Sequence, residues 1–166
     1  MASPASAAKH PVHPMLIVFP VGLLVFSLIC NLIYVLGARD AVWSLVALYT
    51  MGGGIIGGLL AAVPGLIDFT SITDPVIRAI GWRHMLANVT GLVLFIIAFW
   101  RQNIAGSTNV VIVLSILAVI SLAIGGWLGG EMVYVRGLGV ERVEQLERER
   151  AILREPMRRE PMRRVG

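Results

Sequence analysis

Four long apolar segments separated by short polar connections set the pattern of this chain. They cover residues 15–36, 41–67, 82–100 and about 110–130. Each is close to or above the ~20 apolar residues that a helix needs to cross ~30 Å of hydrocarbon. The tight connection at residues 37–40 makes the first two segments antiparallel neighbours. The pattern predicts an all-α integral membrane protein, an up-down-up-down four-helix bundle over residues 10–135.

Polar segments flank this predicted bundle on both sides. Residues 1–9 are small and polar, and we expect them to form a short mobile N-terminus. Residues 136–166 are dense in Arg and Glu, with pairs such as Glu144 and Arg148 one helical turn apart. This spacing predicts a charged, water-exposed C-terminal helix or tail.

The composition agrees with a membrane protein and argues against a nucleic-acid partner. Hydrophobic residues make up 57% of the chain and charged residues 14%, with a mean hydropathy of +0.80, whereas a soluble domain carries about 25% charged residues. The net charge is +4, but nine of the 14 Lys and Arg residues follow Tyr134, so the basic character belongs to the tail. The single cysteine, Cys30, lies inside the first apolar segment and excludes a disulfide framework.

The distribution of basic residues predicts the orientation. Four spans place both termini on one side, together with Lys9, Arg78, Arg83 and the tail arginines, whereas the other side receives Arg39 and Arg101. Cytoplasmic segments carry the excess of Lys and Arg. We therefore expect a multi-pass protein of the bacterial inner membrane with both termini in the cytoplasm.

Glycines repeat at GxxxG spacing in the second and fourth spans. The runs are Gly52–Gly58 and Gly125–Gly130. In lipid, small residues at this spacing allow helix backbones to approach closely. These faces predict tight packing in the bundle and offer a surface for oligomerisation.

Polar residues from all four spans converge on the predicted cytoplasmic edge. They are His10 and His13 before the first span, Asp68 after the second, His84 at the start of the third and Glu131 at the end of the fourth. Ionisable groups at this depth usually face a partner or a cavity. Both His10 and His13 precede proline, which favours extended backbone outside the helix and sets them ~9 Å apart. We expect His13 to be the ligand and His10 its support.

His84, in the first turn of the predicted third span, is the natural partner of His13. Asn88 follows one turn later and could orient the imidazole. The first and third helices of an up-down bundle lie across a diagonal of ~13 Å, which two imidazoles on either side of one iron can bridge. Haem b is therefore a candidate cofactor, with His13, His84, His10 and Asn88 as binding residues.

Two alternatives to haem stay open. A transition metal ion, iron or zinc, could be held by His13, His84, Asp68 and Glu131. The same residues could instead form a structural hydrogen-bond network with no cofactor. The sequence offers no catalytic residue, because its mid-span serines and Cys30 lie far from any histidine, and enzymatic activity is left open.

Several short motifs resemble a known family. His10-Pro11-Val12-His13-Pro14 leads into Phe19-Pro20, Gly65-Leu66-Ile67-Asp68 closes the second span, Arg83-His84 opens the third, and Gly129-Gly130-Glu131-Met132-Val133-Tyr134 precedes Gly137-Leu138-Gly139-Val140. Together they resemble the bacterial four-helix membrane proteins catalogued as domain of unknown function 2231, over residues 9–140. The resemblance implies the fold and no established activity. Some relatives are joined to Rieske-type iron–sulfur domains, which implies a link to redox chemistry.

The sequence thus supports two hypotheses about function. The first is a histidine-centred site that binds haem b or a redox metal and takes part in electron transfer. The second is a non-catalytic structural subunit of a larger membrane complex. Both imply the lipid bilayer as surroundings, and other membrane or redox subunits as partners.

Overall fold

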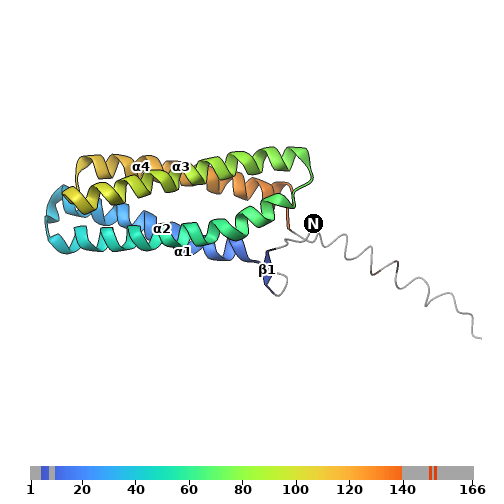
Figure 1. Cartoon of the computed structure of the whole chain (residues 1–166), viewed down its shortest axis with the longest axis horizontal. Helices are drawn as coiled ribbons and strands as arrows, with labels where there is room; N and C mark the ends of the chain where they lie inside the picture. Colours follow the sequence, from blue (N-terminus) through green and yellow to red (C-terminus); the bar gives the residue numbers. More distant parts are fainter. Residues whose placement is uncertain (1–4, 8–9, 140–149, 151, 153–166) are drawn as a thin grey trace, which may run out of the picture.

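Four long helices form a bundle in the computed structural model, which describes residues 5–7, 10–139, 150 and 152. The helices are α1 (Val12–Ile33), α2 (Ala41–Thr70), α3 (Pro75–Ala105) and α4 (Asn109–Gly130), as Figure 1 shows. Each is long and apolar enough to span a membrane. The prediction of an all-α four-helix membrane fold is confirmed. The charged helix or tail predicted for residues 136–166 lies mostly outside the described residues.

Short irregular elements complete the helix ends. The π-helix η1 (Tyr34–Ala38) extends α1, and the chain then turns through Arg39, whose φ of 45° is left-handed. A second π-helix, η2 (Glu131–Val135), extends α4. Near the N-terminus, β1 (Ser6–Ala7) pairs antiparallel with β2 (His10–Pro11). The α1–α2 connection, which includes η1, and the α3–α4 connection lie at the same end of the bundle, here called the loop end.

The helix that carries His84 begins earlier than the apolar pattern predicts. Oδ1 of Asp74 accepts hydrogen bonds of 2.9 Å from the backbone N–H groups of Val76 and Ile77, and Pro75 takes the first helical position. This cap starts α3 at Pro75. His84 therefore lies more than two turns inside α3, not in its first turn.

His13 also differs from its predicted conformation. We expected it outside the helix because it precedes proline, but α1 begins at Val12 and includes it. Pro14 is tolerated in the first turn, where its missing N–H would have no partner in the helix. A hydrogen bond from the His13 ring to α2, described below, helps to hold this conformation. His10 does lie outside α1, in β2.

The bundle consists of two helical hairpins. α1 packs most closely on α2, and α3 on α4, whereas contacts between the hairpins are fewer; Figure 1 shows the pairs α1–α2 and α3–α4 as two layers. Glycines set the close approach inside each hairpin. A Cβ on Gly54 would lie 2.6 Å from Cγ of Leu24, and one on Gly91 would lie 2.9 Å from Leu122. Gly54 and Gly91 thus serve packing within one chain.

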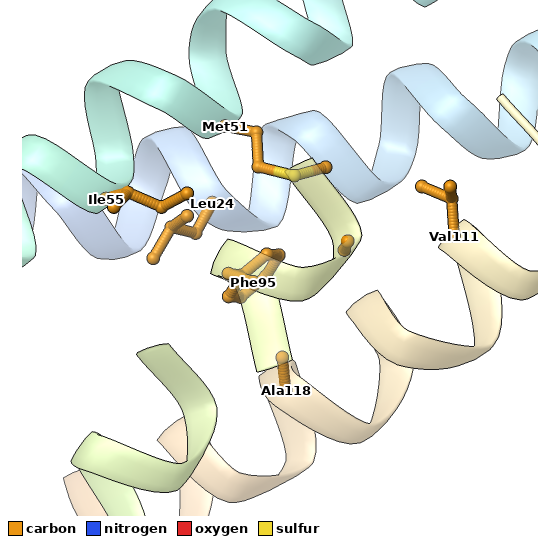
Figure 2. Packing of buried hydrophobic residues seen from close by; sticks show 7 residues of the cluster. Leu24, Met51, Ile55, Phe95, Val111 and Ala118 are labelled. Carbon is orange, nitrogen blue, oxygen red and sulfur yellow. The ribbon is translucent and has the colours of Figure 1, made fainter. Parts of the chain in front are cut away.

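A small apolar core joins the hairpins at mid-length. Its buried members are Leu24, Met51, Ile55, Phe95, Ala98, Val111 and Ala118 (Figure 2). Phe95 is fully buried among them. Many large apolar side chains instead face outward along all four helices, as expected where lipid replaces water. The core separates the loop end from the opposite end of the bundle, here called the histidine end.

Candidate functional site

The rings of His13 and His84 meet between the two hairpins. Their centroids lie 6.2 Å apart, and the ring planes are nearly perpendicular, at 84°. His13 comes from α1 and His84 from α3, the two helices on one diagonal of the bundle. The structure therefore brings together the two residues that the sequence singled out as ligands.

The His13 ring is held by α2. Nδ1 lies 2.7 Å from the backbone carbonyl oxygen of Ala61, so it donates a hydrogen bond to that oxygen. Gly65, one turn further along α2, leaves room for the ring, because a Cβ there would lie 2.8 Å from Nδ1. The hairpin partner of α1 thus supplies both an acceptor and a recess for this imidazole.

The His84 ring is held in the same way by α4. Nδ1 donates to the carbonyl oxygen of Gly125 at 2.8 Å. Gly129, one turn further along α4, makes room for the ring, since a Cβ there would lie 3.1 Å from Cε1. The pairs Ala61–Gly65 and Gly125–Gly129 therefore play equivalent parts in the two hairpins.

These contacts show which nitrogen carries the proton when each ring is neutral. A carbonyl oxygen can only accept a hydrogen bond, so the proton of each neutral ring resides on Nδ1. Nε2 then keeps an in-plane lone pair, which can bind a metal or accept a proton. Metal-binding histidines usually donate their second ring N–H to a carbonyl or carboxylate in this manner. The site thus presents two oriented imidazole donors.

Asn88 lies beside His84, one helical turn further along α3. Its Nδ2 donates to the His84 carbonyl oxygen at 2.8 Å and lies 3.3 Å from Nδ1 and 3.4 Å from Nε2 of the same residue. Because Nδ2 is almost equally far from both ring nitrogens, the amide lies over the face of the ring. It therefore does not hydrogen-bond to the in-plane lone pair of Nε2. Gly125 makes space for this amide, because a Cβ there would lie 2.5 Å from Nδ2.

The other predicted ligands make separate contacts. Oδ1 of Asp68 accepts a hydrogen bond of 3.0 Å from the backbone N–H of Ala5, and Glu131 forms a 3.1 Å ion pair with Arg136. His10 is exposed in β2. Over the part of the chain that the structure describes, no three His, Cys, Asp or Glu side chains are grouped to hold a metal ion. The close pair is His13 and His84.

An internal repeat explains why the two histidines are equivalent. Asn31 and Gln102, 71 residues apart, are both buried, and the same separation relates His13 to His84 and the core residues Leu24 to Phe95. The buried positions of α2 and α4 also correspond at one constant spacing: Ala47 and Val111, Met51 and Ser115, Gly54 and Ala118, Ala61 and Gly125. The two hairpins run in the same sense and are related by a pseudo-two-fold axis along the bundle.

At the loop end this repeat brings two amides together. Nδ2 of Asn31 donates to Oε1 of Gln102 at 3.0 Å, and Gln102 Nε2 donates to the Ser44 carbonyl oxygen and to Oγ of Ser107. Ser107 also donates to Oδ1 of Asn31. The repeat therefore places two imidazoles at one end and two carboxamides at the other.

Reasoning from sequence missed the residues that hold the rings. It placed Gly129 in a glycine run that packs helix backbones and gave Gly65 no part at the histidines, whereas each of the two makes room for an imidazole. Backbone carbonyls such as those of Ala61 and Gly125 carry no sequence signal of their own. The matched spacing of His13 to His84 and of Asn31 to Gln102 could have revealed the repeat.

Comparison with known proteins assigns the chain to a family. No curated protein and no solved structure matches it. The sequence profile of DUF2231, a family of predicted membrane proteins, matches residues 9–142. That range contains all four helices and both histidines of the site. The chain is therefore a member of the DUF2231 family of membrane proteins.

Proposed function

We propose that this membrane protein binds a redox-active metal centre, haem b, between His13 and His84, and that it takes part in electron transfer. One observation carries the proposal. Both imidazoles donate their Nδ1 proton to a carbonyl of the neighbouring helix, and the two rings lie 6.2 Å apart with Nε2 left as a donor to metal. Orientation of both ligands by protein contacts is typical of metal-binding histidines.

The distance between the rings agrees with ligation of one ion from two sides. A bond from metal to imidazole nitrogen is about 2.0–2.1 Å long, so two imidazoles on opposite sides of one ion have centroids about 6 Å apart. The ring planes can take any angle to one another, because each ring turns independently about its own bond to the metal. The observed separation of 6.2 Å is close to this value.

Haem suits this pair better than a bare ion does. Among the described residues no Cys, Asp, Glu or further His side chain joins the two histidines to complete a metal site, whereas a porphyrin would itself supply four nitrogens to the iron and need only two ligands from the protein. The ligands also come from different hairpins, which pack on one another less closely than the helices within each hairpin. When bound, haem iron carries one electron at a potential that the axial ligands and their surroundings set.

We place the histidine end at the cytoplasmic face of a bacterial inner membrane. Arg78 and Arg83 near the start of α3 and Arg136 after η2 support this orientation, against Arg39 and Arg101 at the loop end. A reporter that is active only in the cytoplasm, fused to the C-terminus, should be active. Activity of a reporter that works only outside the cytoplasm would reverse the assignment.

The spectrum of the purified full chain tests the cofactor. Protein produced with a supply of haem should show a Soret band and the electron paramagnetic resonance signal of low-spin, six-coordinate iron. His13→Ala and His84→Ala should each lose the low-spin signal, whereas His10→Ala should keep it. Circular dichroism and size-exclusion profiles would show that the variants are folded. Wild-type protein with neither a Soret band nor a bound transition metal by elemental analysis would refute the proposal.

A structural role is the second candidate, and one observation favours it. The Nδ1 hydrogen bonds tie α1 to α2 and α3 to α4, as the contacts of Gln102 tie helices at the loop end. In that case the protein is a non-catalytic subunit of a membrane complex. His13→Ala and His84→Ala would then lower stability and the yield of co-purifying subunits in a haem-free protein.

A further inference from the structure

An open pocket lies at the loop end, away from the histidines. Its volume is about 390 Å³, within the usual range of about 300–1,000 Å³ for small-molecule sites. It is lined by Tyr34, Ala41, Val42, Ser44, Leu45, Leu48 and Gln102. These residues belong to η1, to the first turns of α2 and to the end of α3. The apolar core lies between this pocket and the histidine pair.

The chemistry of the lining favours a neutral, mainly apolar ligand. None of the lining side chains carries a charge. An ionised head group that entered the pocket would therefore lose its hydration and find no opposite charge there. Val42 and Leu45, which form part of the lining, are 59% and 51% exposed on the outer face of α2. The pocket therefore adjoins the lipid, and a lipid-soluble molecule can reach it from the bilayer.

Among the side-chain donors of the lining, the Tyr34 hydroxyl is the one not used in a hydrogen bond to another described residue. Both Nε2 protons of Gln102 are used, on the Ser44 carbonyl oxygen and on Ser107 Oγ. Ser107 donates to Asn31, so in its 2.8 Å contact with Ser44 the Ser44 hydroxyl must be the donor. The Tyr34 hydroxyl bonds to no described residue. It can donate to a carbonyl oxygen of a ligand.

A π-helix shapes this corner of the pocket. Tyr34 is the first residue of η1, and the segment closes where the backbone N–H of Arg39 donates to the Tyr34 carbonyl oxygen at 3.2 Å. From Tyr34 onward the helix has the wider turn of a π-helix, so side chains there point in different directions than a regular continuation of α1 would give. Single π-helical turns are frequent at functional sites.

We propose that this pocket binds the head group of a lipid-soluble quinone, with the Tyr34 hydroxyl donating to a quinone carbonyl. A quinone ring is neutral and flat, and its outward hydrogen-bonding groups are carbonyl acceptors. It therefore matches a lining that is uncharged, mostly apolar and equipped with one free donor. The isoprenoid tail of such a molecule would lie along the outer face of α2 beside Val42 and Leu45.

The test uses full-length protein in lipid nanodiscs, with decylubiquinone as the probe and quenching of tryptophan fluorescence as the readout. Trp43 lies in the first turn of α2 between two lining residues. Decylubiquinone should bind saturably to the wild type. Tyr34→Phe should weaken binding about five- to tenfold, the effect of one lost hydrogen bond. Tyr49→Phe is the matched control, because Tyr49 is exposed outside the lining, and it should bind as the wild type does.

A second variant, which blocks the pocket, tests quinone binding without changing the Tyr34 hydroxyl. Ala41→Phe adds a ring at the rim and should abolish saturable quenching, while circular dichroism shows the helices intact. Quenching that never saturates, or that is the same in wild type, Tyr34→Phe and Ala41→Phe, would overturn the proposal. So would displacement of the probe by phosphatidylglycerol, which would mark the pocket as a phospholipid site. Spectra of a metal centre at the histidines do not enter this test, so the two proposals fail separately.

Discussion

Asn31 and Gln102 join the two hairpins through a buried hydrogen bond of 3.0 Å at the loop end. The separation of 71 residues between them is the one that relates His13 to His84 at the histidine end. The bundle therefore behaves as two copies of one helical hairpin around a central axis, with a matched pair of polar side chains at each end. The pairs differ in chemistry. The two carboxamides share one hydrogen bond and use their other groups on Ser44 and Ser107, whereas two imidazoles that both carry their proton on Nδ1 leave two Nε2 lone pairs.

The amide pair should contribute measurable coupling energy. Asn31→Leu leaves the Gln102 Oε1 without its donor and removes the acceptor of Ser107, so unfolding in detergent should become easier by about 1–2 kcal/mol. A double-mutant cycle with Gln102→Leu should give a coupling of at least about 0.5 kcal/mol. Asn103→Leu, at an exposed neighbouring position, controls for the added apolar side chain. Strict additivity of Asn31→Leu and Gln102→Leu would contradict the network.

The recesses for the imidazoles should be intolerant of a methyl group. Gly65→Ala places a Cβ 2.8 Å from His13 Nδ1, and Gly129→Ala places one 3.1 Å from His84 Cε1. Each substitution should displace a ring and destabilise the protein by about 1–3 kcal/mol in an unfolding titration. Gly126→Ala is the matched control on α4, since nothing lies within 4 Å of its added Cβ. It should leave stability unchanged or raise it slightly. Equal effects at Gly129 and Gly126 would mean that the recess is not needed.

Asp68 should control the order of the N-terminal segment. Its Oδ1 accepts from the Ala5 N–H, and the Ala5 carbonyl in turn accepts from Val12 N–H. Asp68→Ala should speed hydrogen exchange at Ala5 several-fold, because an amide without a partner exchanges freely. Asp68→Asn keeps an acceptor oxygen and should protect Ala5 nearly as well. Unchanged exchange in Asp68→Ala would show that the contact does not hold the segment.

The sequence predicted the fold well because its dominant signal is physical and local. Runs of apolar residues long enough to cross a bilayer leave few structures other than helices, and short connections make those helices antiparallel. The matching depth of His13 and His84 also followed, since residues at the starts of alternate spans lie on the same side. The start of α3 was missed because the Asp74 cap, and not hydropathy, determines it.

The details of the site could not be predicted in the same way. The acceptors for the histidines are backbone carbonyls of Ala61 and Gly125, and every residue has such a carbonyl, so only the packing of α1 on α2 and of α3 on α4 selects them. The pairing of Asn31 with Gln102 was more accessible to prediction. Polar side chains inside apolar spans face the bundle and pair with one another.

The buried serines Ser115 and Ser27 offer a last test of what a buried hydroxyl contributes to the bundle. The Ser115 hydroxyl is fully buried in α4 and is without a hydrogen-bond partner within the described chain. Ser27 in α1 is equally buried, but its hydroxyl donates to the Leu24 carbonyl oxygen at 2.7 Å. A buried hydroxyl without a partner costs about 1–3 kcal/mol in proteins, and a satisfied one contributes about 0.5–1.5 kcal/mol.

The two serine-to-alanine substitutions should therefore act in opposite directions. Ser115→Ala should raise the free energy of unfolding by about 1 kcal/mol, because it removes an unsatisfied group and leaves only a small void. Ser27→Ala should lower it by about 0.5–1 kcal/mol. Parallel unfolding titrations in one detergent measure both, with haem present and absent. A loss of stability in Ser115→Ala would mean that the hydroxyl has a partner in the membrane, such as a buried water bridging the hairpins.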